Sequence, residues 1–177
     1  HDLRISVIDR CNFRCTYCMP DEHEHSYKFL NQNEWLSFDE IIKLTQIFIS
    51  LGVKKVRLTG GEPLLRPNLH ELINKLSQLK NLEDLALTTN GSLLEKYAPA
   101  LKEAGLKRLT VSLDSLDART FKAMNGKGAL HQVLAGINKA EEAGFKSIKI
   151  NIVIQRGVND HQAVDMVRHF KNTPHVL

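Results

Sequence analysis

The sequence predicts an α/β fold in which parallel strands curve into a partial (βα) barrel. Strand-like and helix-like segments alternate along the 177 residues with short connections between them, which is typical of a parallel sheet with right-handed crossovers. Five βα units are complete, and the chain stops in what reads as the start of a sixth strand. One domain, residues 1–177, accounts for the whole sequence. An open sheet of the flavodoxin type is the structural alternative.

Short aliphatic runs mark the strands, and capping residues and glycines mark the ends of the helices. The expected strands are Leu3–Ile8, Val53–Leu58, Glu83–Thr88, Arg108–Leu113 and Lys146–Ile154. The first expected helix begins at the capping box Ser37–Glu40, ends at Gly52 and repeats apolar residues at one helical spacing, namely Ile41, Leu44, Phe48 and Leu51. The remaining expected helices are Leu69–Leu79, Leu93–Ala104, Ala118–Met124, Leu130–Ala143 and His161–Phe170.

Apolar and polar side chains alternate within the strands. In the last strand the aliphatic row is Ile148, Ile150, Ile152 and Ile154, and the polar row is Lys149, Asn151 and Gln155. A parallel sheet covered on both faces would read as nearly continuous apolar runs. The polar face must therefore line something wet or occupied, because unpaired polar groups in a dry core are costly. We expect a hollow barrel that holds polar ligands, with a sheet open to solvent on one face as the alternative.

Composition and charge limit the classes of partner. The hydrophobic share is 42%, the charged share is 25% and the formal charge is +4. Lysine and arginine are scattered among acidic residues, so a nucleic-acid partner is not expected, whereas a small anion needs only a few cations. No apolar stretch is long enough to cross a bilayer and no signal peptide opens the chain, so we expect a cytoplasmic protein with no membrane partner. The missing initiator Met and the interrupted last strand suggest a fragment.

Three cysteines, Cys11, Cys15 and Cys18, lie in one loop after the first strand. Parallel α/β folds place their active sites at this carboxyl end of the strands. Three thiolates can hold three corners of an iron–sulfur cubane and leave the fourth iron open to a non-protein ligand. The alternative is a zinc site, which needs a fourth protein ligand such as His23 or His25. We expect metal alone to order the loop around residues 11–29.

The run Thr59–Pro63 (TGGEP) ends the second strand. Its glycines let the backbone approach a ligand closely, and the Glu62 carboxylate suits an ammonium group. Together with the CxxxCxxC spacing and the aromatic residue before the last cysteine, this turn resembles the radical S-adenosylmethionine (SAM) superfamily. A zinc module has no reason to place such a turn one βα unit downstream. The resemblance implies a 4Fe–4S cluster held by the three cysteines, and a SAM amino group bound by the GGEP backbone and Glu62.

Within the superfamily the chain is similar to the GTP 3′,8-cyclase family of molybdenum cofactor (molybdopterin) biosynthesis. The similarity spans essentially the whole chain and is carried by Asp2–Val7, Asp9–Cys15, Tyr17–Pro20, Val56–Leu64, Leu87–Gly91, Val111–Asp114 and Lys149–Asn151. The resemblance implies that SAM is contacted by the GGEP turn (Gly60, Gly61 and Glu62), Tyr17 and Ser112. It also implies that GTP is contacted by Arg4, Arg57, Thr88 and Lys149.

The activity implied is the conversion of GTP to 3′,8-cyclo-7,8-dihydro-GTP through a 5′-deoxyadenosyl radical, with a reductant protein as electron donor; a homodimer is compatible with this. The family also carries a second cluster on three C-terminal cysteines, but no cysteine follows Cys18 here. Truncation explains this departure best, and the fragment alone is not expected to turn over.

The strand pattern independently supports an anionic substrate. Arg4, Arg57 and Lys149 lie on the polar faces of three different strands, and converging cations need an anion such as a triphosphate. Taken alone, each is more readily interpreted as a surface cation whose aliphatic stem covers apolar surface while its charged head reaches water; three on three different strands favour the anion site. The alternatives are another radical SAM enzyme, such as a peptide-modifying maturase, or a non-catalytic metal-binding module.

Overall fold

Five parallel strands form one sheet in the structure, a computed structural model that describes residues 1–177 with the exception of the side chain of residue 24. The strands are β1 (Asp2–Ser6), β2 (Lys55–Thr59), β3 (Asp84–Thr89), β4 (Arg108–Ser112) and β5 (Ile148–Asn151). Their spatial order is β1-β2-β3-β4-β5, which is also their order in the sequence. The predicted partial parallel barrel is confirmed, and the flavodoxin-type alternative is excluded because its strand order is not sequential.

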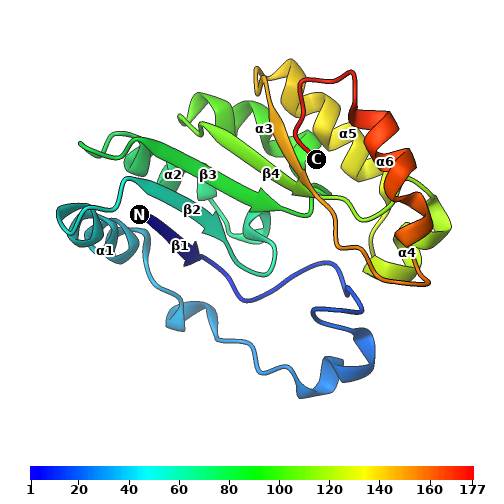
Figure 1. Ribbon diagram of the computed structural model, residues 1–177. Coiled ribbons are helices and arrows are strands. Elements are labelled where there is room, and N and C mark those ends of the chain that lie inside the picture. Colours follow the sequence, from blue (N-terminus) through cyan, green and yellow to red (C-terminus); the bar gives the residue numbers. More distant parts are fainter.

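The helices pack on the aliphatic face of this sheet. They are α1 (Phe38–Ser50), α2 (Leu69–Ser77), α3 (Leu94–Glu103), α4 (Ala118–Asn125), α5 (Leu130–Glu142) and α6 (Ala163–Phe170). In Figure 1, α2, α3 and α5 lie behind the curved sheet. The branched aliphatic core residues that β2 to β5 supply are at most 1% exposed, and they are Val56, Leu58, Leu85, Leu87, Leu109, Val111, Ile148 and Ile150. Among the described residues, no helix combines the length and the apolar character that a membrane crossing requires.

The register places the polar residues of neighbouring strands side by side. Arg4 on β1 is the partner of Arg57 on β2. Thr88 on β3 is the partner of Thr110 on β4, which is in turn the partner of Lys149 on β5. Arg57 is itself paired with Ala86 on β3. Because side chains alternate between the two faces of a strand, the face opposite the helices carries two polar rows, Arg4–Arg57 and Thr88–Thr110–Lys149, which the hydrogen bond from Arg57 to Thr88 joins.

The last residues continue the sheet beyond β5. Val176 forms an isolated parallel bridge with Lys149. The Val176 N–H donates to the Ile148 carbonyl at 3.0 Å, and the Ile150 N–H donates to the Val176 carbonyl at 2.8 Å. The expected start of a sixth strand is confirmed.

The last strand is shorter than the sequence predicts. β5 ends at Asn151 because side chains occupy the backbone groups of Val153. The Val153 N–H donates to Asp114 Oδ1 at 2.9 Å, and Asn159 Nδ2 donates to the Val153 carbonyl at 2.9 Å. Ile154 is therefore 47% exposed, and its expected place in the row facing the helices is wrong.

The apolar stripe of α1 also differs from the expected core face. Ile41 and Thr45 are buried, but Leu44, Phe48 and Leu51 are exposed. Residues four apart lie above each other on a helix, so the face of α1 that meets the core runs through Ile41 and Thr45. The helix exists as predicted, but most of its regularly spaced apolar residues point away from the core.

Candidate functional site

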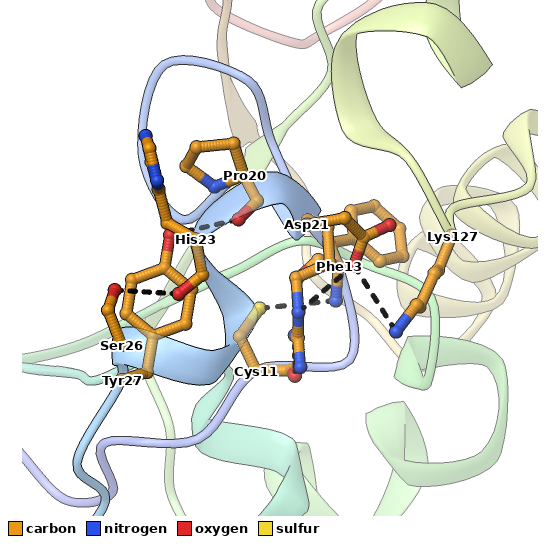
Figure 2. Close-up of polar contacts among 9 residues, drawn as sticks. Cys11, Phe13, Pro20, Asp21, His23, Ser26, Tyr27 and Lys127 are labelled. Carbon is orange, nitrogen blue, oxygen red and sulfur yellow. Dashed lines mark hydrogen bonds and ion pairs between the residues drawn. The ribbon is translucent and has the colours of Figure 1, made fainter.

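The three cysteines lie in the loop that follows β1, at the carboxyl end of the sheet. All three are free thiols; Cys11 and Cys15 are partly buried, and Cys18 is exposed. Burial raises the pKa of Cys11, and it raises the pKa of Cys15 to about 12. The Cys11 sulfur accepts a hydrogen bond from the Phe13 N–H at 3.4 Å (Figure 2). The loop thus presents three thiols with different surroundings.

Protein contacts hold this loop in place. Arg14 Nη1 donates to the carbonyls of Cys11 and Phe13 at 2.8 and 2.9 Å. Asp21 forms an ion pair with Arg14 at 3.5 Å and another with Lys127 at 3.3 Å (Figure 2). The Arg14 N–H also donates to the Asn125 carbonyl at the end of α4, at 3.1 Å. The expectation that metal alone orders residues 11–29 is wrong, because these contacts need no metal.

The GGEP turn packs directly against the backbone that leads into the cysteine loop. The Gly61 N–H donates to the Ile8 carbonyl at 2.7 Å, and the Glu62 N–H donates to the Arg10 carbonyl at 2.8 Å. A Cβ on Gly60 would lie 2.4 Å from the Ile8 oxygen, and one on Gly61 would lie 2.2 Å from the Arg10 oxygen. Glycine is therefore required here for the contact between the two loops. Its expected role in admitting SAM stays a prediction.

Glu62 is completely buried and faces protein donors. Its carboxylate accepts hydrogen bonds from Leu64 N at 3.0 Å, Thr89 Oγ1 at 2.7 Å and Asn90 N at 2.7 Å. Burial raises the pKa of Glu62. The structure thus shows a role that the sequence did not predict, because Glu62 clamps the GGEP turn to the loop after β3. Contact between Glu62 and the SAM ammonium group stays a prediction.

A hydrogen bond joins Tyr17 to the residues that follow the carboxyl end of β4. Its hydroxyl donates to Asp114 Oδ2 at 2.5 Å, and burial together with Asp114 raises the pKa of Tyr17 above its usual range. Ser112, the last residue of β4, is partly buried two positions before Asp114. Two of the expected SAM contacts therefore lie at the same end of the sheet as the cysteines. Sequence reasoning assigned no role to Asp114; its place just after a strand end was the available signal.

The expected substrate cations lie on the polar face, as their alternation predicts. Arg57 Nη1 donates to Thr88 Oγ1 at 3.2 Å and to Thr110 Oγ1 at 2.9 Å. Arg57 and Lys149 line one hollow of about 520 Å³ at the amino ends of β4 and β5, and four more basic residues contribute to it: Lys102, Lys107, Arg108 and Lys146. Arg4 lies one strand further out, on β1 beside Arg57. The structure thus brings together two of the three cations and places the third next to them.

The donor set around the cysteines fits an iron–sulfur cluster better than zinc. The His23 ring points away from Cys11 in Figure 2. Within the part of the chain whose side chains are described, no three His, Cys, Asp or Glu side chains, the three cysteines included, lie close enough together to hold a metal ion, so the comparison rests on the residue types in the loop. Three free thiols on one short loop match the three protein ligands of a cluster with one open iron.

The sequence pattern described as the Radical SAM superfamily matches residues 5–170. The chain belongs to the radical SAM superfamily. Membership implies a 4Fe–4S cluster and SAM as its cofactors. The structure agrees with this membership, because its cysteine loop lies at the carboxyl end of a parallel sheet.

Curated relatives with the name GTP 3′,8-cyclase resemble this radical SAM chain closely. One from Xanthomonas campestris pv. campestris (strain 8004) is 54% identical over 177 residues, which cover 99% of this chain and 52% of the relative. One from Staphylococcus saprophyticus is 50% identical over 173 residues, covering 97% and 51%. The chain therefore spans about half the length of the curated relatives it matches.

Solved structures share the fold at lower sequence identity. The FeFe-hydrogenase maturase HydG from Carboxydothermus hydrogenoformans has a TM-score of 0.72 at 17% identity and covers 98% of this chain and 42% of its own. Streptococcus suis SuiB, bound to its precursor peptide SuiA, has a TM-score of 0.74 at 21% identity and covers 96% and 37%. Identities this low support the fold alone.

Proposed function

We propose that this chain is the radical SAM core of a GTP 3′,8-cyclase, which converts GTP to 3′,8-cyclo-7,8-dihydro-GTP in molybdenum cofactor biosynthesis. The observation that carries the proposal is the hollow at the amino ends of β4 and β5, which Arg57 and Lys149 line together with further basic residues. Converging cations of this kind suit a polyphosphate. The relatives named GTP 3′,8-cyclase, at 50% and 54% identity, support the same substrate.

Cys11, Cys15 and Cys18 would hold the cluster in this proposal, and SAM would be bound by Tyr17, Ser112 and the GGEP residues Gly60, Gly61 and Glu62. When bound, the cluster and SAM supply the radical chemistry. The chain's own residues orient these groups. Asp114 fixes the Tyr17 hydroxyl, and the hydrogen bonds of Glu62 fix the GGEP turn beside the cysteine loop.

GTP would be bound by Arg4, Arg57, Thr88 and Lys149. Arg57 is oriented before the substrate arrives, because the hydroxyls of Thr88 and Thr110 accept from one of its nitrogens. A guanidinium held in this way loses little side-chain freedom when it binds a phosphate. Arg57 also lines the hollow that Lys149 lines.

A peptide-modifying maturase is the second candidate, since SuiB shares the fold. A hollow lined by several basic residues favours a polyphosphate over a peptide backbone, which carries no charge. A non-catalytic metal-binding module would not need a hollow lined by basic residues, so the hollow favours an enzyme with an anionic substrate. We further propose that the protein is cytoplasmic, that a separate reductant protein supplies its electrons, and that it can form a homodimer. We expect no nucleic-acid partner.

The test uses the whole protein, reconstituted with iron and sulfide without oxygen and incubated with GTP, SAM and dithionite. Mass spectrometry should find a product isomeric with GTP, together with 5′-deoxyadenosine and methionine. The same incubation with a precursor peptide in place of GTP is the comparison. Cleavage of SAM that depends on peptide, with GTP unchanged, would replace the cyclase proposal by the maturase.

A further inference from the structure

Asn90 lies in the loop after β3, between the Glu62 clamp and the cysteine loop. The Asn90 backbone N–H donates to Glu62 Oε2 at 2.7 Å. Glu62 is fully buried and is also bonded to Thr89 Oγ1 at 2.7 Å. The buried carboxylate of Glu62 therefore fixes the position of the Asn90 backbone.

The orientation of the Asn90 carboxamide is fixed as well. Its Oδ1 accepts from the Ser92 N–H at 3.0 Å and from the Ser92 hydroxyl at 2.7 Å. A backbone N–H can only donate, so the oxygen of the amide must face Ser92. The amide nitrogen then faces the cysteine loop, where Nδ2 lies 2.9 Å from Asn12 Oδ1 and 3.9 Å from the Cys11 sulfur.

Cys15 is surrounded differently. Its sulfur lies 3.0 Å from Asn125 Oδ1, which is an acceptor, and the Asn125 amide nitrogen donates instead to the Phe121 carbonyl at 3.1 Å. Two asparagines, Asn90 in the loop after β3 and Asn125 at the end of α4, thus approach two cysteines with opposite ends of their carboxamides. The one at Cys11 offers a hydrogen-bond donor to the sulfur, beside the donor supplied by Phe13 N.

We propose that Asn90 is a positioning residue for the cluster, which holds Cys11 in place and donates to its sulfur, so that the reduction potential of the cluster is raised. Hydrogen bonds to ligand sulfurs are one of the levers that set such potentials. One electron from the reductant protein adds negative charge that the thiolate sulfurs share, and a donor at Cys11 stabilises that charge. The inference rests on the proposed ligation of the cluster by Cys11.

The test is a redox titration of the reconstituted chain, followed by electron paramagnetic resonance (EPR). Asn90→Ala removes the donor, and Asn90→Asp keeps an oxygen for Ser92 while it removes the amide nitrogen. Both should give a more negative midpoint potential at an unchanged iron content. Ser92→Ala should leave the potential unchanged, because Ser92 N still holds the amide oxygen. Asn74→Ala, at an exposed position of α2, is the matched asparagine control.

A second readout observes the hydrogen bond itself. Pulsed EPR on the reduced cluster in protein labelled with ¹⁵N-asparagine should detect a nitrogen coupling that Asn90→Ala loses and Ser92→Ala keeps. A wild-type midpoint potential in either Asn90 variant, at wild-type iron content, overturns the inference and leaves the proposed function intact. A parent chain that takes up no iron would instead overturn the proposed function.

Discussion

Arg57 Nη1 on β2 donates to Thr110 Oγ1 on β4 at 2.9 Å and so reaches across β3. Thr110 is itself buried and is the register partner of Lys149 on β5. The hydroxyl therefore fixes the arginine over the part of the hollow that Lys149 lines. A hydroxyl of this kind affects substrate binding without touching the substrate.

Thr110→Val should weaken GTP binding to the whole protein by about tenfold or more, because it removes one hydrogen bond to a charged group, worth about 1.5–3 kcal/mol. Isothermal titration with GTP measures this effect. Thr110→Ser keeps the hydroxyl and should bind as the parent does. Equal losses in Thr110→Val and Thr110→Ser would point to packing rather than to the orientation of Arg57.

Arg57→Ala or Lys149→Ala should weaken GTP binding more than tenfold, since a charge-assisted contact in a partly desolvated site is worth roughly 2–5 kcal/mol. Iron content and SAM binding should not change. Arg168→Ala, an exposed arginine of α6, is the control for lost positive charge. Unchanged GTP affinity in both site variants would remove the support for a triphosphate.

Glu62→Ala should lower the free energy of unfolding by at least about 2 kcal/mol, because it leaves two buried donors and one partly buried donor without an acceptor. Denaturant unfolding of the metal-free chain measures this loss. Glu103→Ala, at the exposed end of α3, should change stability by less than about 0.5 kcal/mol. A Glu62→Ala variant as stable as the parent would mean that water replaces the carboxylate.

The thiols of the metal-free chain should react with iodoacetamide at different rates at pH 8. Cys18 is exposed and should react first. Cys15 should react last, because burial raises its pKa to about 12 and only the thiolate is nucleophilic. Peptide mass spectrometry after timed quenching gives the three rates. Cys15 reacting as fast as Cys18 would contradict the protein contacts seen around the loop.

The strands and the polar row were predictable because they depend on local alternation, as Arg57 and Lys149 show. The length of β5 was not, because the groups that end it, Asp114 and Asn159, come from other parts of the chain. The face of α1 was also not predictable, since the apolar spacing of Leu44 and its neighbours does not say which row meets the sheet.

In the site, too, contacts between distant parts of the chain could not be predicted from the sequence. A glutamate after two glycines was visible in the sequence, but its partners Thr89 and Asn90 lie almost thirty residues further on. Only the fold brings them together. The cysteine spacing was informative because all three ligands lie within one loop, so no distant contact was needed to recognise them.

Anaerobic reconstitution of the chain with iron and sulfide tests the central claim most directly. The chain should bind about four irons, and SAM should change the EPR spectrum of the reduced cluster, whereas Cys15→Ser should abolish both. Stoichiometric zinc with no uptake of iron, or a reduced cluster whose spectrum is indifferent to SAM, would contradict the account of Cys11, Cys15 and Cys18 as the ligands of a radical SAM cluster.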